Sequence, residues 1–229
     1  MKRVAIIQSN YIPWKGYFDI INMVDLFIFH DDLKFTKQDW RNRNLIKTPE
    51  GLRWLTIPCG SSENRLINQV RLPDNKWCKK HWSIISEFYN KARYFDSYKP
   101  FFEDIYLNRK WETLSEINQY IIKKISSEIL GSSTIFENSE TFNLTLKKEH
   151  RIKELLIKCG AKTYLSGTSA KDYLSESFLS DFGVNLEWMD YSNYREYHQL
   201  SPPFNHNVSI IDLLFNEGPD AKSFMKSFN

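Results

Sequence analysis

The first thirty residues constrain the fold more than any other part of the chain. Two short apolar runs, at residues 3–8 and 25–30, flank a segment with helical spacing at residues 16–24. Continuous apolar runs are typical of strands buried on both faces, so the pattern predicts a βαβ unit in a parallel sheet. Such crossovers are almost always right-handed, which puts the loops after both strands at the carboxyl edge of the sheet. We expect residues 8–15 and 30–34 to be neighbours there, where open α/β sheets bind ligands.

The rest of the chain predicts further α/β alternation around a helical insertion. Residues 52–58 and 69–72 have strand character and are joined by a turn too short for a crossover helix, which favours antiparallel pairing. Helices are expected at 77–91, 100–107, 112–130, 147–158 and 170–179, and strands at 163–165 and 184–189. Ser209 and Asp212 fit a capping box that opens a last helix. The prediction is a single domain over residues 1–229, of class α/β: a three-layer, Rossmann-like, mainly parallel sheet with a helical insertion at about 74–131.

Composition excludes several classes of protein. Apolar residues make up 41% of the chain and charged residues 26%, the balance of a folded chain rather than a disordered one. The net charge of +3 is too small to indicate a general nucleic-acid binder. Three cysteines without C-x-x-C spacing argue against a disulfide framework or a zinc ribbon. The chain also lacks a signal-like start and any apolar run long enough for a membrane span, so we expect a cytoplasmic protein.

Residues 8–47 hold the densest group of side chains suited to binding. Between residues 34 and 53 six basic residues accompany two acidic ones, and this local surplus of 6 − 2 = +4 exceeds that of the whole chain. Guanidinium and amide groups suit phosphate oxygens and sugar hydroxyls, and aromatic rings can stack on a base or sugar. The alternative is a solvated basic loop with its aromatic residues in the core. The candidate substrate-binding residues of this region are Gln8, Asn10, Tyr11, Trp14, Lys15, Asp31, Trp40, Arg41, Asn42, Arg43, Asn44 and Lys47.

Two residues are candidates for proton transfer. Asp32 follows the second apolar strand together with His30 and Asp31, and its carboxylate could act as a general base or only pair with the following lysines. His81 lies on the apolar stripe of the helix expected at 77–91, where it is either a hydrogen-bonded core residue or a general base. Two adjacent aspartates are a weak signal for Mg²⁺, and we predict no metal site.

A small-residue turn offers a second binding element. Residues 163–174 run from a strand through Ser166, Gly167, Thr168 and Ser169 into an expected helix. Free N–H groups at such a helix start favour phosphate, and Lys171 would add a positive charge. The alternative is that the turn serves only as a helix cap.

Together these motifs resemble the WbqC-like family of bacterial polysaccharide-biosynthesis proteins. The resemblance covers nearly the whole chain. Its motifs are Q-x-N-Y-x-P-W-x-G-Y-F at 8–18, D-D at 31–32, W-R-N-R-N-x-I-K at 40–47, W-L-T-I-P at 54–58, W-x-x-x-H at 77–81, Y-L-S-G at 164–167, A-K-D-Y-L at 170–174 and S-x-x-D-x-L-F-N at 209–216. The family commonly has proline where this chain has Ser9 and Thr168, which puts the shape of two turns in doubt.

The resemblance implies a role in making surface polysaccharides, such as the O-antigen of lipopolysaccharide, that contain modified amino sugars. The leading hypothesis is a transferase that N-acylates or N-aminoacylates, for example glycylates, the amine of a nucleotide-linked deoxyamino sugar. Arg41, Arg43 and the Ser166 turn would hold the diphosphate, and Asp32 or His81 would accept the proton. The donor is left open between acyl-CoA, an acyl-carrier protein and aminoacyl-tRNA, the last being the only expected contact with nucleic acid. No tightly bound cofactor is expected, and a homodimer is one option for an oligomeric state that the sequence leaves open.

Two other functions stay open. The succession of strand, loop, helix and strand, with a late Ser-Gly-Thr before a helix, is similar to nucleotidyltransferases of the HIGH type. Their first loop carries histidines that contact the phosphates of ATP, whereas this chain has Trp14 and Tyr17 at those places. The third candidate is a non-catalytic partner that binds a sugar nucleotide within a biosynthetic complex.

Overall fold

A five-stranded parallel sheet forms the centre of the protein. The structure is a computed structural model that describes residues 2–62, 64–172 and 174–228. The sheet order is β5-β2-β1-β6-β7, and every neighbouring pair is parallel. Its strands are β1 (Arg3–Ile7), β2 (Leu26–Phe29), β5 (Ile135–Asn138), β6 (Thr163–Ser166) and β7 (Asn185–Trp188). The predicted parallel sheet is confirmed.

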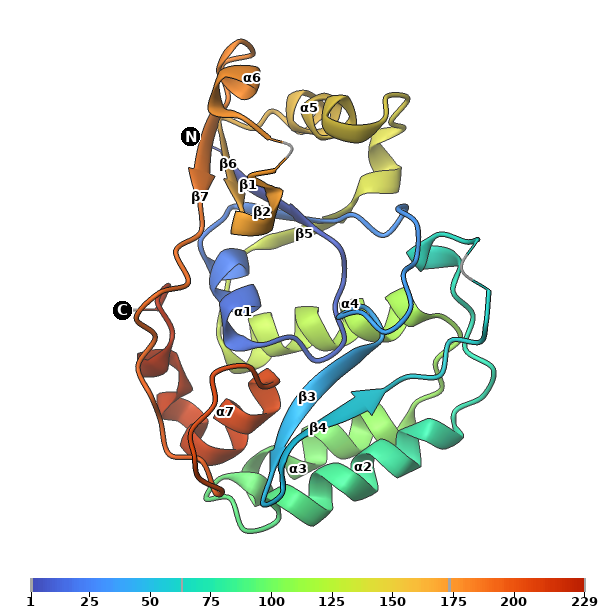
Figure 1. Cartoon of the computed structure of the whole chain (residues 1–229), viewed down its shortest axis with the longest axis vertical. Helices are drawn as coiled ribbons and strands as arrows, with labels where there is room; N and C mark the ends of the chain where they lie inside the picture. Colours follow the sequence, from blue (N-terminus) through green and yellow to red (C-terminus); the bar gives the residue numbers. More distant parts are fainter. Residues whose placement is uncertain (1, 63, 173, 229) are drawn as a thin grey trace.

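Helices cover both faces of this sheet (Figure 1). On one face, β-strand residues such as Val4 and Ile28 pack in a cluster with Leu155 of α5 (Lys148–Lys158). On the other, Ala5 and Phe27 join the larger core built with α1 (Lys15–Asn22) and α4 (Leu114–Lys124). Side chains on a strand alternate between faces, so an all-apolar strand is what two covered faces require. The predicted three-layer, Rossmann-like fold is confirmed.

The strand order creates a crevice at one point of the carboxyl edge. The chain runs from β1 outward through β2 to β5 and then returns to β6 on the other side of β1. The connections therefore diverge between β1 and β6, and a ligand can enter between them. The loops after β1 and β2 touch there: Ser9 N–H donates to the Asp31 carboxylate (2.7 Å), and His30 N–H donates to the Ile7 carbonyl (3.1 Å). The expected neighbourhood of these two loops is confirmed.

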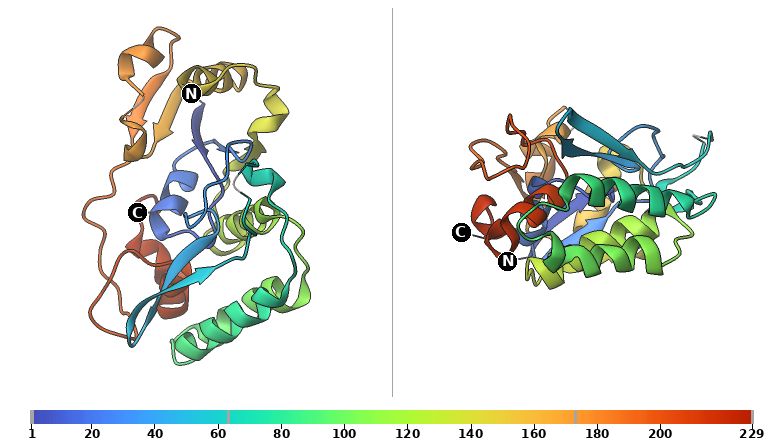
Figure 2. Two further views of the ribbon diagram at one scale, coloured as in Figure 1. Left: turned by 45° about the vertical axis from the view of Figure 1, so that its right-hand side comes forward. Right: turned by 90° about the horizontal axis from the view of Figure 1, so that it is seen from below.

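A β-hairpin follows, and its strands differ from those predicted. It pairs β3 (Arg43–Thr48) with β4 (Gly51–Thr56) in antiparallel register. The prediction of a strand near 52–58 is confirmed, but its predicted partner at 69–72 is wrong. That region contains a short 3-10 helix, Ile67–Gln69, and a single bridge between Arg71 and Thr113. The hairpin lies between α2 and α7, as the views in Figure 2 show.

The helical insertion contains three helices, which confirms that prediction. They are α2 (Lys76–Tyr89), α3 (Phe95–Glu103) and α4, and a π-helical turn extends each of the last two, at Asp104–Asn108 and Ile125–Ile129. At the start of α4 the Thr113 hydroxyl accepts from the N–H of Glu116, whose carboxylate accepts from the N–H of Thr113. This reciprocal cap fixes the point at which the helix begins.

The last part of the chain contains two short α-helices among its described residues, and a 3-10 helix, Gly218–Phe224, follows them. α6 covers Glu176–Ser180, so the helix expected at 170–179 is wrong over its first half; Tyr173 lies outside the described residues. α7 (Ile210–Glu217) begins as predicted, because the Ser209 hydroxyl accepts from the N–H of Ile211. The Asp212 carboxylate does not complete that cap and accepts three hydrogen bonds in the core.

Candidate functional site

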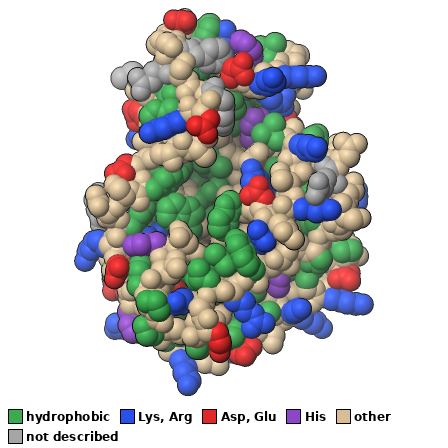
Figure 3. All heavy atoms as spheres, viewed as in Figure 1, with side chains coloured by type: hydrophobic (Ala, Val, Ile, Leu, Met, Phe, Trp, Pro, Cys, Tyr) green, Lys and Arg blue, Asp and Glu red, His purple; other side chains and the backbone are tan. Residues whose placement is uncertain are grey.

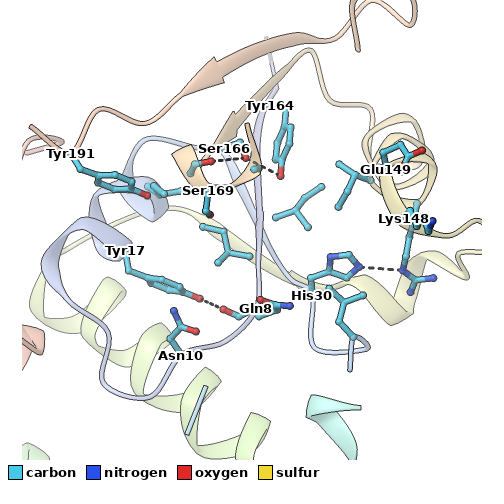
Figure 4. Close-up of a pocket in the computed structure, with 18 of the residues that line it drawn as sticks. Gln8, Asn10, Tyr17, His30, Lys148, Glu149, Tyr164, Ser166, Ser169 and Tyr191 are labelled. Atoms are coloured by element: carbon cyan, nitrogen blue, oxygen red, sulfur yellow. Dashed lines mark hydrogen bonds between the residues drawn. The ribbon is translucent and has the colours of Figure 1, made fainter. Parts of the chain in front are cut away.

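A cavity of about 550 Å³ opens at the crevice between β1 and β6. This volume lies within the range of roughly 300–1,000 Å³ that is usual for small-molecule sites. Its walls come from the ends of β1, β2 and β6 and from the first turns of α1 and α5 (Figure 4). Polar residues that line it are Gln8, Asn10, His30, Lys148, Glu149, Arg151, Ser166 and Ser169.

Aromatic rings form much of the remaining wall. Trp14, Tyr17, Tyr164 and Tyr191 line the cavity, and the rings of Trp14 and Tyr191 lie 5.2 Å apart. A Cβ atom at Gly16 would overlap the Trp14 ring, so glycine at this position allows the indole to lie against the start of α1. The Tyr17 hydroxyl donates to the Gln8 carbonyl (3.0 Å; Figure 4). Rings held in this way offer flat surfaces for a base.

A cluster of charged groups lies where β2 meets α5. Arg151 forms an ion pair with Asp32, and its Nε–H donates to His30 Nε2 (3.2 Å). The Ser139 hydroxyl donates to the other oxygen of Asp32 (2.5 Å). Burial is the main cause that lowers the pKa of His30, against the attraction of Asp32, so the imidazole is neutral at pH 7. Asp32 is therefore paired with Arg151, a cation of the cavity wall.

Two more charged residues reach the cavity from the first turn of α5. Lys148 and Glu149 both line it, and Figure 4 shows them on the same side of the opening as the helix. The one ion-pair contact found for Glu149 among the described residues is with His150, at 3.7 Å from Nε2. Lys148 thus supplies positive charge for an anion, with Arg151 as a second cation that is also paired with Asp32. Glu149 supplies a carboxylate that no lysine or arginine neutralises among the described residues.

The turn after β6 lies at the cavity, but it opens no α-helix. Ser166 and Gly167 line the wall, and Thr168–Ala170 form a single 3-10 turn. Lys171 does not line the cavity, since its ammonium lies over the Trp188 ring, 5.5 Å from the centroid. The expected phosphate site therefore retains the Ser166 turn without the lysine.

Most side chains of the basic segment make contacts within the fold and do not line the cavity. Arg41 bonds the Gln8 side chain and pairs with Asp39, and Arg43 lies over the Trp54 ring, 4.1 Å from the centroid. Neither guanidinium lines the cavity. The Nδ2 groups of Asn42 and Asn44 donate to backbone carbonyls. Arg41 and Arg43, which contribute to the local positive charge of the sequence, thus contact other groups of the fold and are not directed into the cavity.

Three other predicted binding residues are buried. Lys15 Nζ donates to the Arg195 carbonyl (3.2 Å) between two tyrosine rings, and burial lowers the pKa of Lys15 to about 8. Lys47 is buried beside Asp212, and the Asp31 carboxylate accepts from Ser9 N–H and from the Gln119 amide (3.0 Å). These contacts hold the loops that form the cavity.

His81 lies apart from the cavity, in contact with the core. Its Nδ1 is 2.8 Å from the Tyr11 hydroxyl, which in turn bonds Tyr106 (2.7 Å). The ring lines a different depression, beside β4 and α2. Asp32 pairs with Arg151 at the main cavity, so Asp32 and His81, the two predicted proton-transfer residues, lie in different places. The contacts of His81 favour the core alternative, and its catalytic role stays a prediction.

The buried side chains of His30 and His81 should make the free energy of unfolding depend on pH. Burial lowers the pKa of His81 and that of His30 to about 4, below the value near 6.5 in an unfolded chain. Between these values the unfolded chain binds more protons, so the free energy of unfolding falls as the pH drops from about 6.5 to about 4. The expected slope is up to about 1.4 kcal/mol per pH unit for each histidine.

Urea unfolding at several pH values between about 7 and 5 measures this slope. H81Q should reduce it, because one of the two histidines is gone. H198Q removes a histidine that is exposed, not buried, and serves as the matched control. A wild-type stability that is flat over this range would contradict the neutral, buried state of both rings.

Sequence reasoning missed the groups that α5 contributes. Lys148, Glu149 and Arg151 reach the cavity, yet none was a predicted site residue. A helix that follows a parallel strand begins at the carboxyl edge, but this rule could place α5 only once the preceding strand β5 was known. Among the described residues, no group of three or more His, Cys, Asp or Glu side chains is placed to hold a metal ion. None of the helices in that part of the chain is long and apolar enough to cross a membrane.

Comparison with known proteins places this chain in a family. The WbqC-like protein family matches residues 8–224. The uncharacterized protein Rv1507c of Mycobacterium tuberculosis is 40% identical over 228 residues, which covers 99% of this chain and 98% of that protein. No solved structure matches the chain significantly. Because the match spans both the cavity loops and the helical insertion, the chain belongs to the WbqC-like protein family.

Proposed function

We propose that the chain transfers an acyl or aminoacyl group, such as glycyl, to the amine of a nucleotide-linked deoxyamino sugar. The observation that carries the proposal is the cavity at the switch point of the sheet, where one wall holds Lys148, Arg151 and Glu149 together. Crevices at this point of open α/β sheets suit nucleotides. The two cations suit a diphosphate, and the aromatic wall suits a base.

The proposed reaction needs an oriented amine and one group that accepts a proton. The acceptor ammonium loses a proton to Glu149, and the free amine attacks the donor carbonyl carbon. A nitrogen–carbon bond forms, the bond from that carbon to the thioester sulfur or to the tRNA ester oxygen breaks, and the leaving group takes up the second proton that the nitrogen loses. Positioning and one base account for most of the rate in such a transfer.

Mass spectrometry tests the proposal directly. Nucleotide-linked amino sugars are incubated with the protein and with acyl-CoA, acyl-carrier protein or glycyl-tRNA as donors. The expected product is heavier than the acceptor by one acyl group, and no product should form when a hydroxyl replaces the acceptor amine. The proposed step does not use a metal, so activity should persist in EDTA.

Nucleotidyl transfer is the second candidate, because the strand order and the helix that follows β1 would also suit ATP. Trp14 and Tyr17 line the cavity where histidines would be needed, which disfavours it. Metal-dependent release of pyrophosphate, with no mass gain on any amino sugar, would replace our proposal with this one. Binding of the sugar nucleotide without any reaction would favour a non-catalytic partner.

A further inference from the structure

A smaller pocket of about 180 Å³ adjoins the main cavity. Asn10 and Trp14 line both hollows, so the two share a wall formed by the loop after β1. Its volume corresponds to about six water molecules at liquid density. The residues that line it are Asn10, Pro13, Trp14, Trp40, Asn44 and Asn207.

The lining of this pocket is uncharged and rich in amides. Three of its six residues are asparagine. Asn44 is fixed, since its Nδ2 donates to the Tyr11 and Ile12 carbonyls and its Oδ1 accepts from Leu45 N–H (2.8 Å). Among residues 2–62, 64–172 and 174–228, the side-chain amides of Asn10 and Asn207 have no hydrogen-bond partner. An amide both donates and accepts, which is the pattern that a sugar hydroxyl offers in return.

The indoles of Trp14 and Trp40 complete the pocket. Trp40 is 45% exposed although it follows directly on a well-anchored turn, in which its carbonyl accepts from Tyr11 N–H (2.9 Å). Its ring lies 5.5 Å from that of Trp54. In the space-filling view of Figure 3, hydrophobic side chains gather in a band across the middle of the molecule. A flat apolar ring beside free amides suits the C–H face of a pyranose, with its hydroxyls at the rim.

We propose that the smaller pocket binds the neutral, hydroxyl-bearing edge of the pyranose in a nucleotide-linked sugar, whose amine and nucleotide lie in the main cavity that Glu149 lines. The shared wall makes the two positions continuous, as one covalent ligand requires. The inference rests on the proposed function for its nucleotide. No lysine or arginine among the described residues lines this pocket, so a sugar that carries a carboxylate would be desolvated there without a partner and should be rejected.

Calorimetry with three probes tests this inference: UDP, UDP-glucose and UDP-glucuronic acid, with dTDP and dTDP-rhamnose as a second series. We expect the neutral sugar to tighten binding at least about tenfold over the nucleoside diphosphate, and the glucuronic acid to give no gain. W40A should remove most of this gain while UDP affinity changes less than about twofold. F182A removes a similarly exposed aromatic ring that lines neither pocket, and it should retain the gain.

The outcomes separate the pocket from the proposed function. If a nucleoside diphosphate binds but neither neutral sugar adds affinity, or W40A and F182A behave alike, the sugar pocket is overturned and the nucleotide site stands. If no nucleotide binds, the proposed function fails, and saturation-transfer NMR with methyl glucoside tests the pocket alone. A signal that W40A abolishes and F182A retains would then support the pocket, and the absence of a signal would overturn it as well.

Discussion

E149Q is expected to lower turnover by roughly 10²- to 10⁴-fold while acceptor binding changes little. The Glu149 carboxylate lines the cavity and is paired with neither lysine nor arginine among the described residues, so it is available to accept a proton. The amide of glutamine has nearly the same shape but cannot take that proton at neutral pH. The rate is measured as acyl transfer to the amino sugar, and binding is measured by calorimetry.

A matched carboxylate distinguishes loss of the base from a general effect of the substitution. Glu87 is exposed on α2 and lies outside the cavity, so E87Q makes the same chemical change elsewhere. Its turnover should equal that of the wild type. If E149Q keeps full turnover, Glu149 is not the base. H81Q and D32N would then become the variants to compare, because His81 and Asp32 are the proton acceptors that the sequence indicates.

The inner strands β1 and β2 of the sheet were predictable because neither has a polar face. β1 and β2 lie in the middle of the sheet, with helices on both sides, so every inward position needs an apolar residue. Their apolar runs were therefore unambiguous, and the right-handed crossover placed Gln8 and His30 at one edge. Both residues line the cavity.

The edge strand β5 was missed for the opposite reason. It pairs with β2 on one side only, and its residues alternate between exposed and partly buried. A strand of four residues that includes Glu137 and Asn138 does not stand out in the sequence. Without β5, no rule placed the start of α5 at the carboxyl edge. The charged residues of α5 consequently remained outside the predicted site.

The β3 strand was hidden by polar side chains that the tertiary structure satisfies. Asn44 and Lys47 are 3% and 6% exposed, although amide and ammonium groups usually indicate a surface loop. Asn44 bonds two carbonyls of the cavity loop, and the N–H of Lys47 donates to the Tyr89 hydroxyl on α2. These partners lie 32 or more positions away in the chain. A local pattern cannot reveal such contacts, and the segment therefore resembled a basic anion-binding loop.

The second large effect is expected from the cations of α5. K148Q combined with R151Q should weaken the binding of UDP or dTDP, because each lost charged hydrogen bond to a phosphate costs about 1.5–3 kcal/mol. This corresponds to roughly 10- to 150-fold in affinity for each residue. Calorimetry at fixed ionic strength measures the change, since phosphate binding depends on salt. R151K keeps the charge beside Asp32 and should lose less than R151Q.

Removing two cations also lowers the net charge, which a second double variant controls. K153Q with K162Q removes the same charge from α5 and from the chain before β6, and neither residue lines the cavity. Its nucleotide affinity should stay near that of the wild type. Because Arg151 also neutralises the partly buried Asp32, unfolding in urea must show that the R151Q chain remains folded at the assay temperature. If a folded K148Q/R151Q protein binds nucleotide as tightly as the wild type, the diphosphate does not lie at the start of α5, and Arg41 beside Gln8 becomes the cation to test.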